Sequence, residues 1–178
     1  MKVTKRDGSS ERRILTGMIV DKAIISRIAT KWEPNLFNSA WGNLIGGWCV
    51  QFFEEYEDAP KKEIEGLFEA WAADNRDEDT IQIVEKFLGD LSSEYESLAK
   101  ESNSEYIIDQ ASKYFNRIKL KRLSESISGD VTTGNLDKAL GRINQYGRIE
   151  MGVGAGIDPL SDEDAIREAF QEQLEPLV

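Results

Sequence analysis

Three short segments of the chain contain residue types that could do chemistry, and each lacks a partner that its chemistry requires. Residues 152–156 are glycine-rich like a phosphate-binding loop, but no Lys follows to reach the phosphates and no strand is expected before them. Residues 97–100, Ser-Leu-Ala-Lys, have the spacing of a serine nucleophile and its base, without the Ser-Asp-Asn and Lys-Thr-Gly elements that accompany it. Residues 74–79 are acidic like a calcium loop, yet Arg76 occupies a ligand position and the sixth residue is not Gly. None of the three predicts a catalytic or cofactor site.

The composition excludes further classes of chemistry. The 178 residues include no His, which removes Ser-His-Asp and Cys-His catalysis and His-ligated metals. Cys49 is the only cysteine, so an internal disulfide and a cysteine metal cluster are also excluded. Lys and Arg total 22 against 33 Asp and Glu, a net charge of −11, which argues against a general nucleic-acid binder. We therefore expect a protein that is not an enzyme and that holds no cofactor and no metal.

One cluster of positive charge stands out in this acidic chain. Lys113, Arg117 and Lys121 are spaced four residues apart, which places them on one stripe of a helix. Three interpretations remain open: a solvated face, a docking stripe for an acidic partner surface, and a contact with nucleic acid. The acidic surroundings favour pairing between subunits over DNA.

Apolar residues recur with the helical period nearly throughout, which predicts an all-α fold. We expect residues 1–8 to form a disordered tail and residues 9–102 to form a small helical globule. The third helix of this globule carries a wide aromatic stripe, which predicts the central helix of the core. Gly42, Gly46 and Gly47 lie off that stripe and predict close helix packing. The five helices expected in the globule run from Ser9 or Ser10 to about Val20, from Asp21 to the break at 33–35, from Asn38 or Ser39 to about Tyr56, over 60–73 and over 78–100.

Residues 103–146 predict a long helical hairpin. Its first helix begins at Asn103 or Ser104 and is expected to end at the Ser-Gly-Asp run 128–130, and Asn135 begins a shorter second helix. A hairpin of this kind has few core partners of its own, so we expect it to pack on another chain. The residues predicted to form this oligomer interface are Tyr106, Lys113, Tyr114, Arg117, Lys121, Leu136, Leu140 and Ile143.

The remaining residues, 147–178, predict a glycine-rich linker followed by one amphipathic helix that begins at Ser161. A single amphipathic helix is not stable by itself, so this helix needs a docking surface on this domain or on a partner. Its apolar docking face comprises Ile166, Ala169, Phe170 and Leu174.

No segment predicts export or membrane insertion. The apolar run 14–20 follows basic residues but lacks a cleavage site, and the run 44–53 is too short to cross a bilayer. We expect a cytoplasmic protein that does not contact a membrane.

Several runs occur in an order that is informative as a whole. An acidic residue, Glu11, precedes the apolar run 14–21, and residues 32–41 place a Pro and a Phe before the aromatic helix. That helix ends in the acidic run 53–60, and the hairpin begins with Asn-x-x-Tyr at 103–106. This succession, from about residue 10 to the basic run that ends at Arg122-Leu123 and on to residue 146, resembles the N-terminal domain of DnaB-type replicative DNA helicases, in a phage or mobile-element branch. Trp41 stands where the family has a histidine.

The resemblance implies a noncatalytic domain. In this family the hairpins pair between subunits and build a collar on the helicase hexamer, and the collar contacts primase and in some systems a helicase loader. A linker helix, which residues 161–174 resemble, leads to the motor domain, and DNA is reached only through that motor. No Walker loop occurs in this chain, so we expect either a piece of a helicase or a standalone collar-like protein. Two alternatives remain: the helicase-binding domain of a primase, and a phage adaptor that binds a replisome component.

Overall fold

The structure is a computed structural model that describes residues 5–75, 77–101 and 103–152. Over these residues the fold is all-α, as predicted, with seven α-helices and one short 3-10 helix. The predicted docking face Ile166, Ala169, Phe170 and Leu174 lies outside the described residues. The helices are α1 (Lys5–Val20), α2 (Lys22–Ala29), α3 (Ala40–Tyr56), η1 (Lys61–Glu63), α4 (Ile64–Asp74), α5 (Glu78–Glu101), α6 (Ser104–Thr132) and α7 (Leu136–Asn144).

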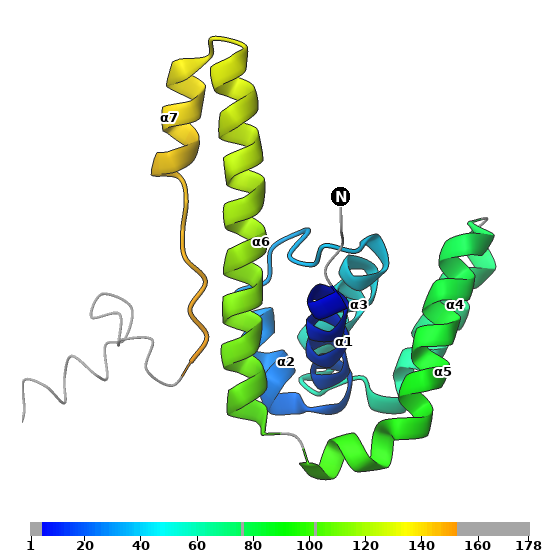
Figure 1. The fold of residues 1–178 in the computed structure, drawn as a ribbon. Coiled ribbons are helices and arrows are strands. Elements are labelled where there is room, and N and C mark those ends of the chain that lie inside the picture. The colour runs from blue at the N-terminus through cyan, green and yellow to red at the C-terminus, as the bar shows by residue number, and fades with distance from the viewer. Residues whose placement is uncertain (1–4, 76, 102, 153–178) are drawn as a thin grey trace, which may run out of the picture.

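The predicted central helix, α3, packs against four helices, α1, α2, α4 and α5, but helix α1 is the more deeply buried of the two. Helix α1 packs against α2, α3, α5 and α6 (Figure 1) and buries Ile14, Leu15, Met18 and Ile19. The aromatic stripe of α3 faces the α4–α5 pair at the side of the molecule, where several of its rings stay partly exposed. Helix α1 also begins at Lys5, upstream of the predicted caps Ser9 and Ser10, since Ser inside a helix costs only a few tenths of a kcal/mol.

The predicted caps of α2, α3 and α6 are confirmed. The Asp21 carboxylate accepts from the backbone N–H of Ala23 at 2.8 Å. Ser39 caps α3 through Gly42, and Asn103 caps α6 through Tyr106. Each of these side chains satisfies a helical N–H that has no partner within its own helix, which sets where the helix begins.

The close packing predicted at the glycines of α3 holds for two of the three. A Cβ on Gly46 would lie 2.6 Å from the Trp32 ring, and one on Gly42 would lie 3.1 Å from Cβ of Phe37. Gly47 faces open space, so the prediction was wrong there. The loop before α3 therefore lies directly on the helix, with Phe37 fully buried against it.

One buried carboxylate holds that loop in place. Glu11, on α1, is 4% exposed, and its Oε1 accepts from the backbone N–H of Asn38 at 2.6 Å and of Ser39 at 3.1 Å. The hydroxyl of Tyr114, on α6, donates to the same oxygen at 2.5 Å. Glu11 thus joins α1, the start of α3 and α6 at one point, which gives the acidic residue at the start of the chain a structural role.

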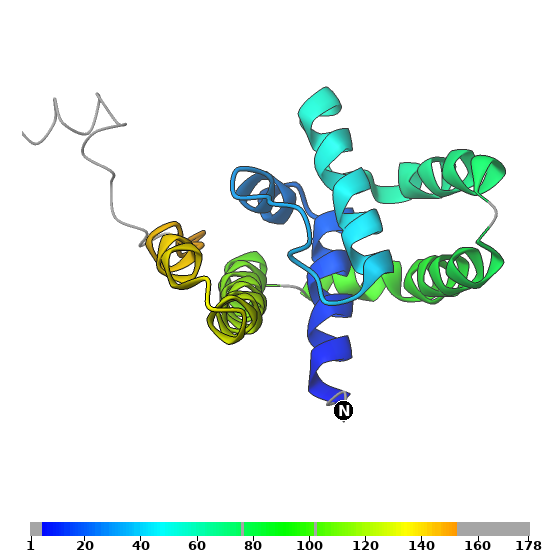
Figure 2. The same ribbon diagram turned by 90° about the horizontal axis from the view of Figure 1, so that it is seen from above.

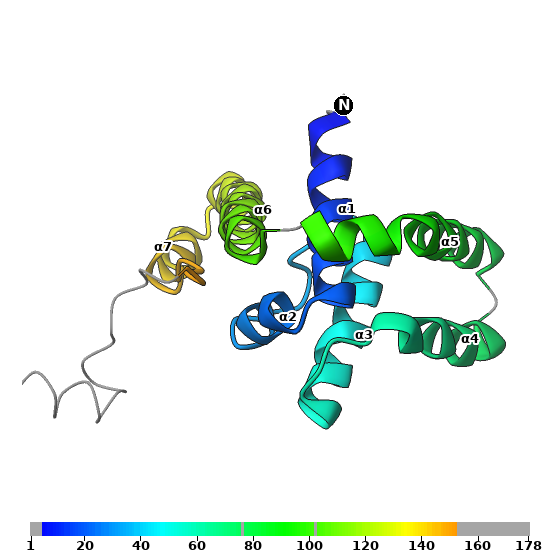
Figure 3. The same ribbon diagram turned by 90° about the horizontal axis from the view of Figure 1, so that it is seen from below.

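Helices α4 and α5 form a pair at one side of α1 and α3, and they run side by side in Figures 2 and 3. Helix α5 buries Val84, Phe87, Leu88 and Leu91. The acidic segment before α5 acts as a helix start: Asp77 accepts from the backbone N–H of Thr80 at 3.2 Å and from its hydroxyl at 2.5 Å.

Helix α6 belongs both to the globule and to the hairpin. Its first half packs on α1 and α2 and buries Ile107, Ile108, Phe115 and Ile118, so the predicted boundary at residue 103 does not separate two cores. Its second half rises beyond the globule, with α7 packed beside it (Figure 1). The predicted end of the helix at 128–130 was wrong.

The helix continues to Thr132 because Gly134, and not Gly129, takes the left-handed conformation, with φ of 75°, in which a helix terminates at low cost. In the described part of the chain, no helix is both long and apolar enough to cross a membrane.

Candidate interaction surface on the helical hairpin

The second half of α6 and the whole of α7 form a hairpin with a very small core of its own. Ala139 is the only residue of α7 that is buried, and it faces α6. The tip is held by Asp130, whose carboxylate accepts from Nε of Arg142 at 2.5 Å and lies 3.7 Å from Nζ of Lys138. This charge cluster closes α7 onto α6.

The tip of the hairpin is expected to loosen in acid. The hydrogen bond from the Arg142 guanidinium holds the pKa of Asp130 below its usual value. A lowered folded-state pKa means that the stabilisation is complete above the unfolded-state pKa, about 3.9, and is lost as the pH falls through the folded-state value. Hydrogen-exchange protection factors of the α7 amides are therefore expected to be high at pH 6 and to drop below pH 4.

The variant Asp130→Asn is the control for this prediction. It is expected to bring the protection at pH 6 down to the acid level and to abolish the further decrease in acid. Unchanged protection in this variant would show that Asp130 does not hold the hairpin closed.

One face of α7 carries the largest exposed apolar side chains of the hairpin. Leu136, Leu140 and Ile143 are 59%, 58% and 50% exposed, and their spacing of four and three residues places them on one stripe. Val131, near the end of α6, is exposed as well. Within the described residues nothing covers this stripe, so it is an apolar part of the predicted interface that is open to a partner.

The other predicted interface residues lie along α6 and are not all at the surface. Tyr106 is half-exposed at the base of the helix, with the Arg13 guanidinium 5.0 Å from its ring centre. Lys113 is exposed and pairs with Asp109 at 2.6 Å. Tyr114 is buried, with its hydroxyl on Glu11, and is not on the surface of this chain.

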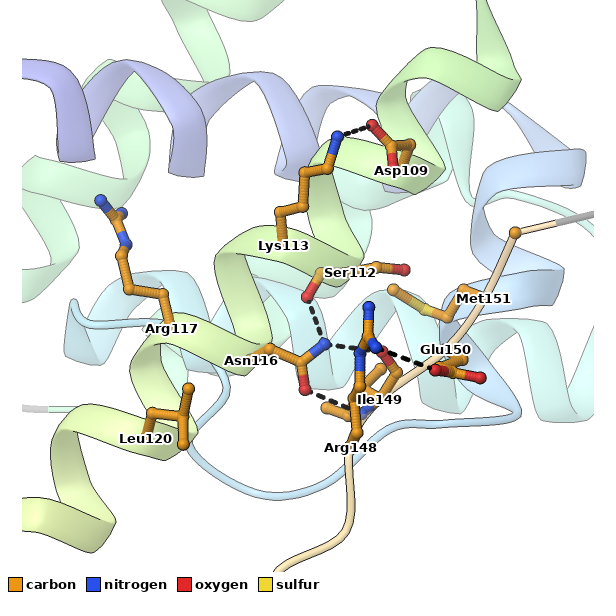
Figure 4. Close-up of a pocket in the computed structure, with 11 residues that line it drawn as sticks. Asp109, Ser112, Lys113, Asn116, Arg117, Leu120, Arg148, Ile149, Glu150 and Met151 are labelled. Atoms are coloured by element: carbon orange, nitrogen blue, oxygen red, sulfur yellow. Dashed lines mark hydrogen bonds and ion pairs between the residues drawn. The ribbon is translucent and has the colours of Figure 1, made fainter. Parts of the chain in front are cut away.

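The basic stripe borders a groove that the sequence analysis did not foresee. After α7 the chain returns along α6, and residues 148–152 lie against it as a strap (Figure 4). The open groove between them has a volume of about 610 Å³ and is bordered by Lys113, Arg117 and Leu120 on α6. Lys121, at the end of the stripe, is exposed and does not line the groove.

Asn116 attaches the strap to the helix. Its Nδ2 donates to the carbonyl oxygen of Ile149 at 2.6 Å, and its Oδ1 accepts from the backbone N–H of the same residue at 2.8 Å. Within the strap, the side chains of Ile149 and Met151 are buried. The predicted linker that begins at 147 is therefore packed against the domain as far as Gly152. The sequence held a signal for this: residues 148–151 alternate polar and apolar, which is typical of an extended segment with one buried face.

Replacing Asn116 by Leu is expected to release the strap while keeping the side-chain volume similar. The change leaves two backbone groups of Ile149 without partners, at a cost of about 1–3 kcal/mol. The population of molecules with a detached strap therefore rises roughly five- to 150-fold. Trypsin cleavage after the exposed Arg148, followed by mass spectrometry, measures this population. The matched control is Lys113→Ala, which alters the groove without touching the strap. Equal cleavage rates in both variants would contradict the role of Asn116.

The described residues offer little for chemistry. Burial raises the pKa of the Cys49 thiol, which keeps it protonated and poorly nucleophilic. No group of three or more His, Cys, Asp or Glu side chains that could hold a metal occurs in the part of the chain that the structure describes. The side chains of Ser97 and Lys100 lie outside the described residues.

We compared the chain with known proteins by sequence and by structure. No protein-family model matches it, and no curated protein and no solved structure matches it significantly.

Proposed function

We propose that this chain is a noncatalytic oligomerisation and partner-docking domain of a DnaB-type replicative DNA helicase. The observation that carries the proposal is the apolar stripe Leu136, Leu140 and Ile143, which lies at least half-exposed on a hairpin that stands away from the globule. Exposed apolar side chains grouped on one face are typical of a protein–protein contact. A hairpin with a small core also gains most from packing on a second hairpin.

The strength of this contact follows from the area it hides. Three half-exposed apolar side chains from each copy hide a small apolar area, so the gain exceeds the cost of association only by a small margin. Association costs at least about 4 kcal/mol in lost translational and rotational freedom. The isolated domain is therefore expected to associate weakly, and tethering the copies in a larger ring strengthens the contact.

The assignment to a helicase rests on the order of sequence features from residue 10 to 146. Glu11, the acidic residue near the start of that order, joins α1, the start of α3 and α6 in the fold. Primase, and in some systems a helicase loader, are the partners that this function implies.

Sedimentation velocity from low micromolar to near-millimolar concentration tests the self-association. The weight-averaged sedimentation coefficient is expected to rise with concentration, and a strict monomer throughout would overturn the oligomerisation proposal. The reading frame after the codon for Val178 tests the helicase assignment. A G-x-x-x-x-G-K-[ST] loop downstream is expected. A stop at that point would favour a standalone adaptor.

A further inference from the structure

A second surface lies between α3 and α4, on the side of the molecule away from the hairpin (Figures 1 and 3). The end of α3 and the start of α4 enclose a groove of about 360 Å³. Its apolar lining is formed by Trp48, Phe52, Tyr56 and Leu67, and its acidic lining by Glu55 and Glu63.

The apolar lining is aromatic and partly open to solvent. The rings of Phe52 and Tyr56 pack with their centres 4.6 Å apart, and Tyr56 is 59% exposed. Trp48 is held from behind by Trp71, with a ring-centre distance of 5.6 Å. Aromatic side chains that are fixed in place yet exposed are enriched at protein interfaces, and their faces attract Lys and Arg.

The charge of the groove has one sign. Glu55 and Glu63 are its only ionisable acidic or basic lining side chains, and no Lys or Arg lines it in the described part of the chain. Lys61, close by in sequence, is engaged by Asp58 at 2.9 Å. The neighbouring Glu55, by hydrogen bonding and by its charge, raises the pKa of Tyr56. Two carboxylates beside aromatic rings complement a side chain with an apolar stem and a positive end.

The shape of the groove admits a backbone as well as side chains. Gly66 lines it at an exposed helical position where an added Cβ would meet nothing within 4 Å. A partner helix can therefore approach α4 closely at this point. The volume of the α3–α4 groove is at the low end for ligand pockets. It suits one or two inserted side chains better than a complete small molecule.

We propose that the α3–α4 groove docks a basic amphipathic helix of another protein, which inserts an apolar side chain between the aromatic rings and pairs a Lys or Arg with Glu55 and Glu63. This docking does not depend on the hairpin or on the assignment to a helicase. It provides an acidic docking point on the opposite side of the molecule from the proposed oligomer contact.

The test uses the full chain and a designed probe, a helical peptide of Leu and Lys with one apolar face, beside the same peptide with Glu in place of Lys. In ¹⁵N–¹H correlation spectra, the Lys peptide is expected to shift the backbone signal of Gly66 and the indole signal of Trp48. The signal of Gly89, an equally open glycine on α5, is expected to stay in place. The Glu peptide is expected to shift none of the three.

Paired charge reversals separate the groove from the general acidity of the protein. Glu55→Lys with Glu63→Lys is expected to weaken the peptide affinity about tenfold or more, measured by calorimetry. The control, Glu65→Lys with Glu69→Lys, makes the same charge change on exposed residues of α4 outside the groove and is expected to change it less than about twofold. All four glutamates are exposed, so both variants are expected to keep the fold.

Three results would overturn the inference. Equal weakening by both reversals would show general electrostatic attraction, and shifts that avoid Gly66 would place the peptide elsewhere. A change in the self-association of the protein alone on reversal of Glu55 and Glu63 would make the groove a contact between copies. Leu136→Asp is expected to leave peptide binding intact, so a failure of this inference and a failure of the hairpin proposal are distinguishable.

Discussion

Replacing Glu11 by Ala is expected to lower the free energy of unfolding by about 3–5 kcal/mol, the largest effect of any single side chain outside the apolar core. The carboxylate is buried and accepts three hydrogen bonds, from the backbone of Asn38 and Ser39 and from the hydroxyl of Tyr114. Removing it leaves these donors without their acceptor and opens a cavity between α1, the start of α3 and α6. Urea denaturation followed by tryptophan fluorescence measures the loss.

Two milder variants apportion this effect. Glu11→Gln keeps one acceptor oxygen without the charge and is expected to cost about 1–2 kcal/mol, and Tyr114→Phe removes one donor and is expected to cost about 1 kcal/mol. The order Ala, Gln, Phe from most to least destabilising is the expected result. A loss below about 1 kcal/mol in Glu11→Ala would mean that α1 does not hold the start of α3 through this carboxylate.

Replacing Leu136 or Leu140 by Asp is expected to raise the dissociation constant of the self-associated protein about a hundredfold, which leaves a monomer at accessible concentrations. Each change removes an apolar side chain from the stripe on α7 and places a carboxylate where a second copy would exclude water. Both residues are more than half exposed in the single chain, so thermal stability is expected to stay within about 0.5 kcal/mol of the original. Sedimentation velocity measures the association, and thermal melting measures the fold.

Ile83→Asp is the matched control. Ile83 is about as exposed as Ile143 but lies on α5, on the opposite side of the globule, so its replacement is expected to leave association unchanged. An oligomer that survives both Leu variants would exclude the α7 stripe as the contact. An oligomer that is lost equally with Ile83→Asp would indicate general apolar attraction.

The local features of the fold followed from the sequence alone. The helical spacing of apolar residues, together with capping and helix-breaking residues, predicted each of the seven α-helices. Asp21, Ser39 and Asn103 begin their helices as expected. These features depend on residues within one or two turns of each other, and that information is present in the order of the chain. The absence of His and the presence of a single Cys excluded whole classes of catalysis. These exclusions depend only on composition and need no knowledge of the fold.

The tertiary structure alone decided which apolar faces are covered. Tyr106 and Tyr114 both lie on α6, and the sequence alone does not distinguish them. Tyr114 is nevertheless buried, because Glu11, 103 residues away in the chain, lies against its hydroxyl. Likewise, α3 has the strongest aromatic pattern, yet several of its rings stay partly exposed, while α1 buries Ile14, Leu15, Met18 and Ile19 completely. Helical periodicity records that a face is apolar; which neighbour covers it, or whether it stays open as on α7 and in the α3–α4 groove, depends on contacts between distant segments.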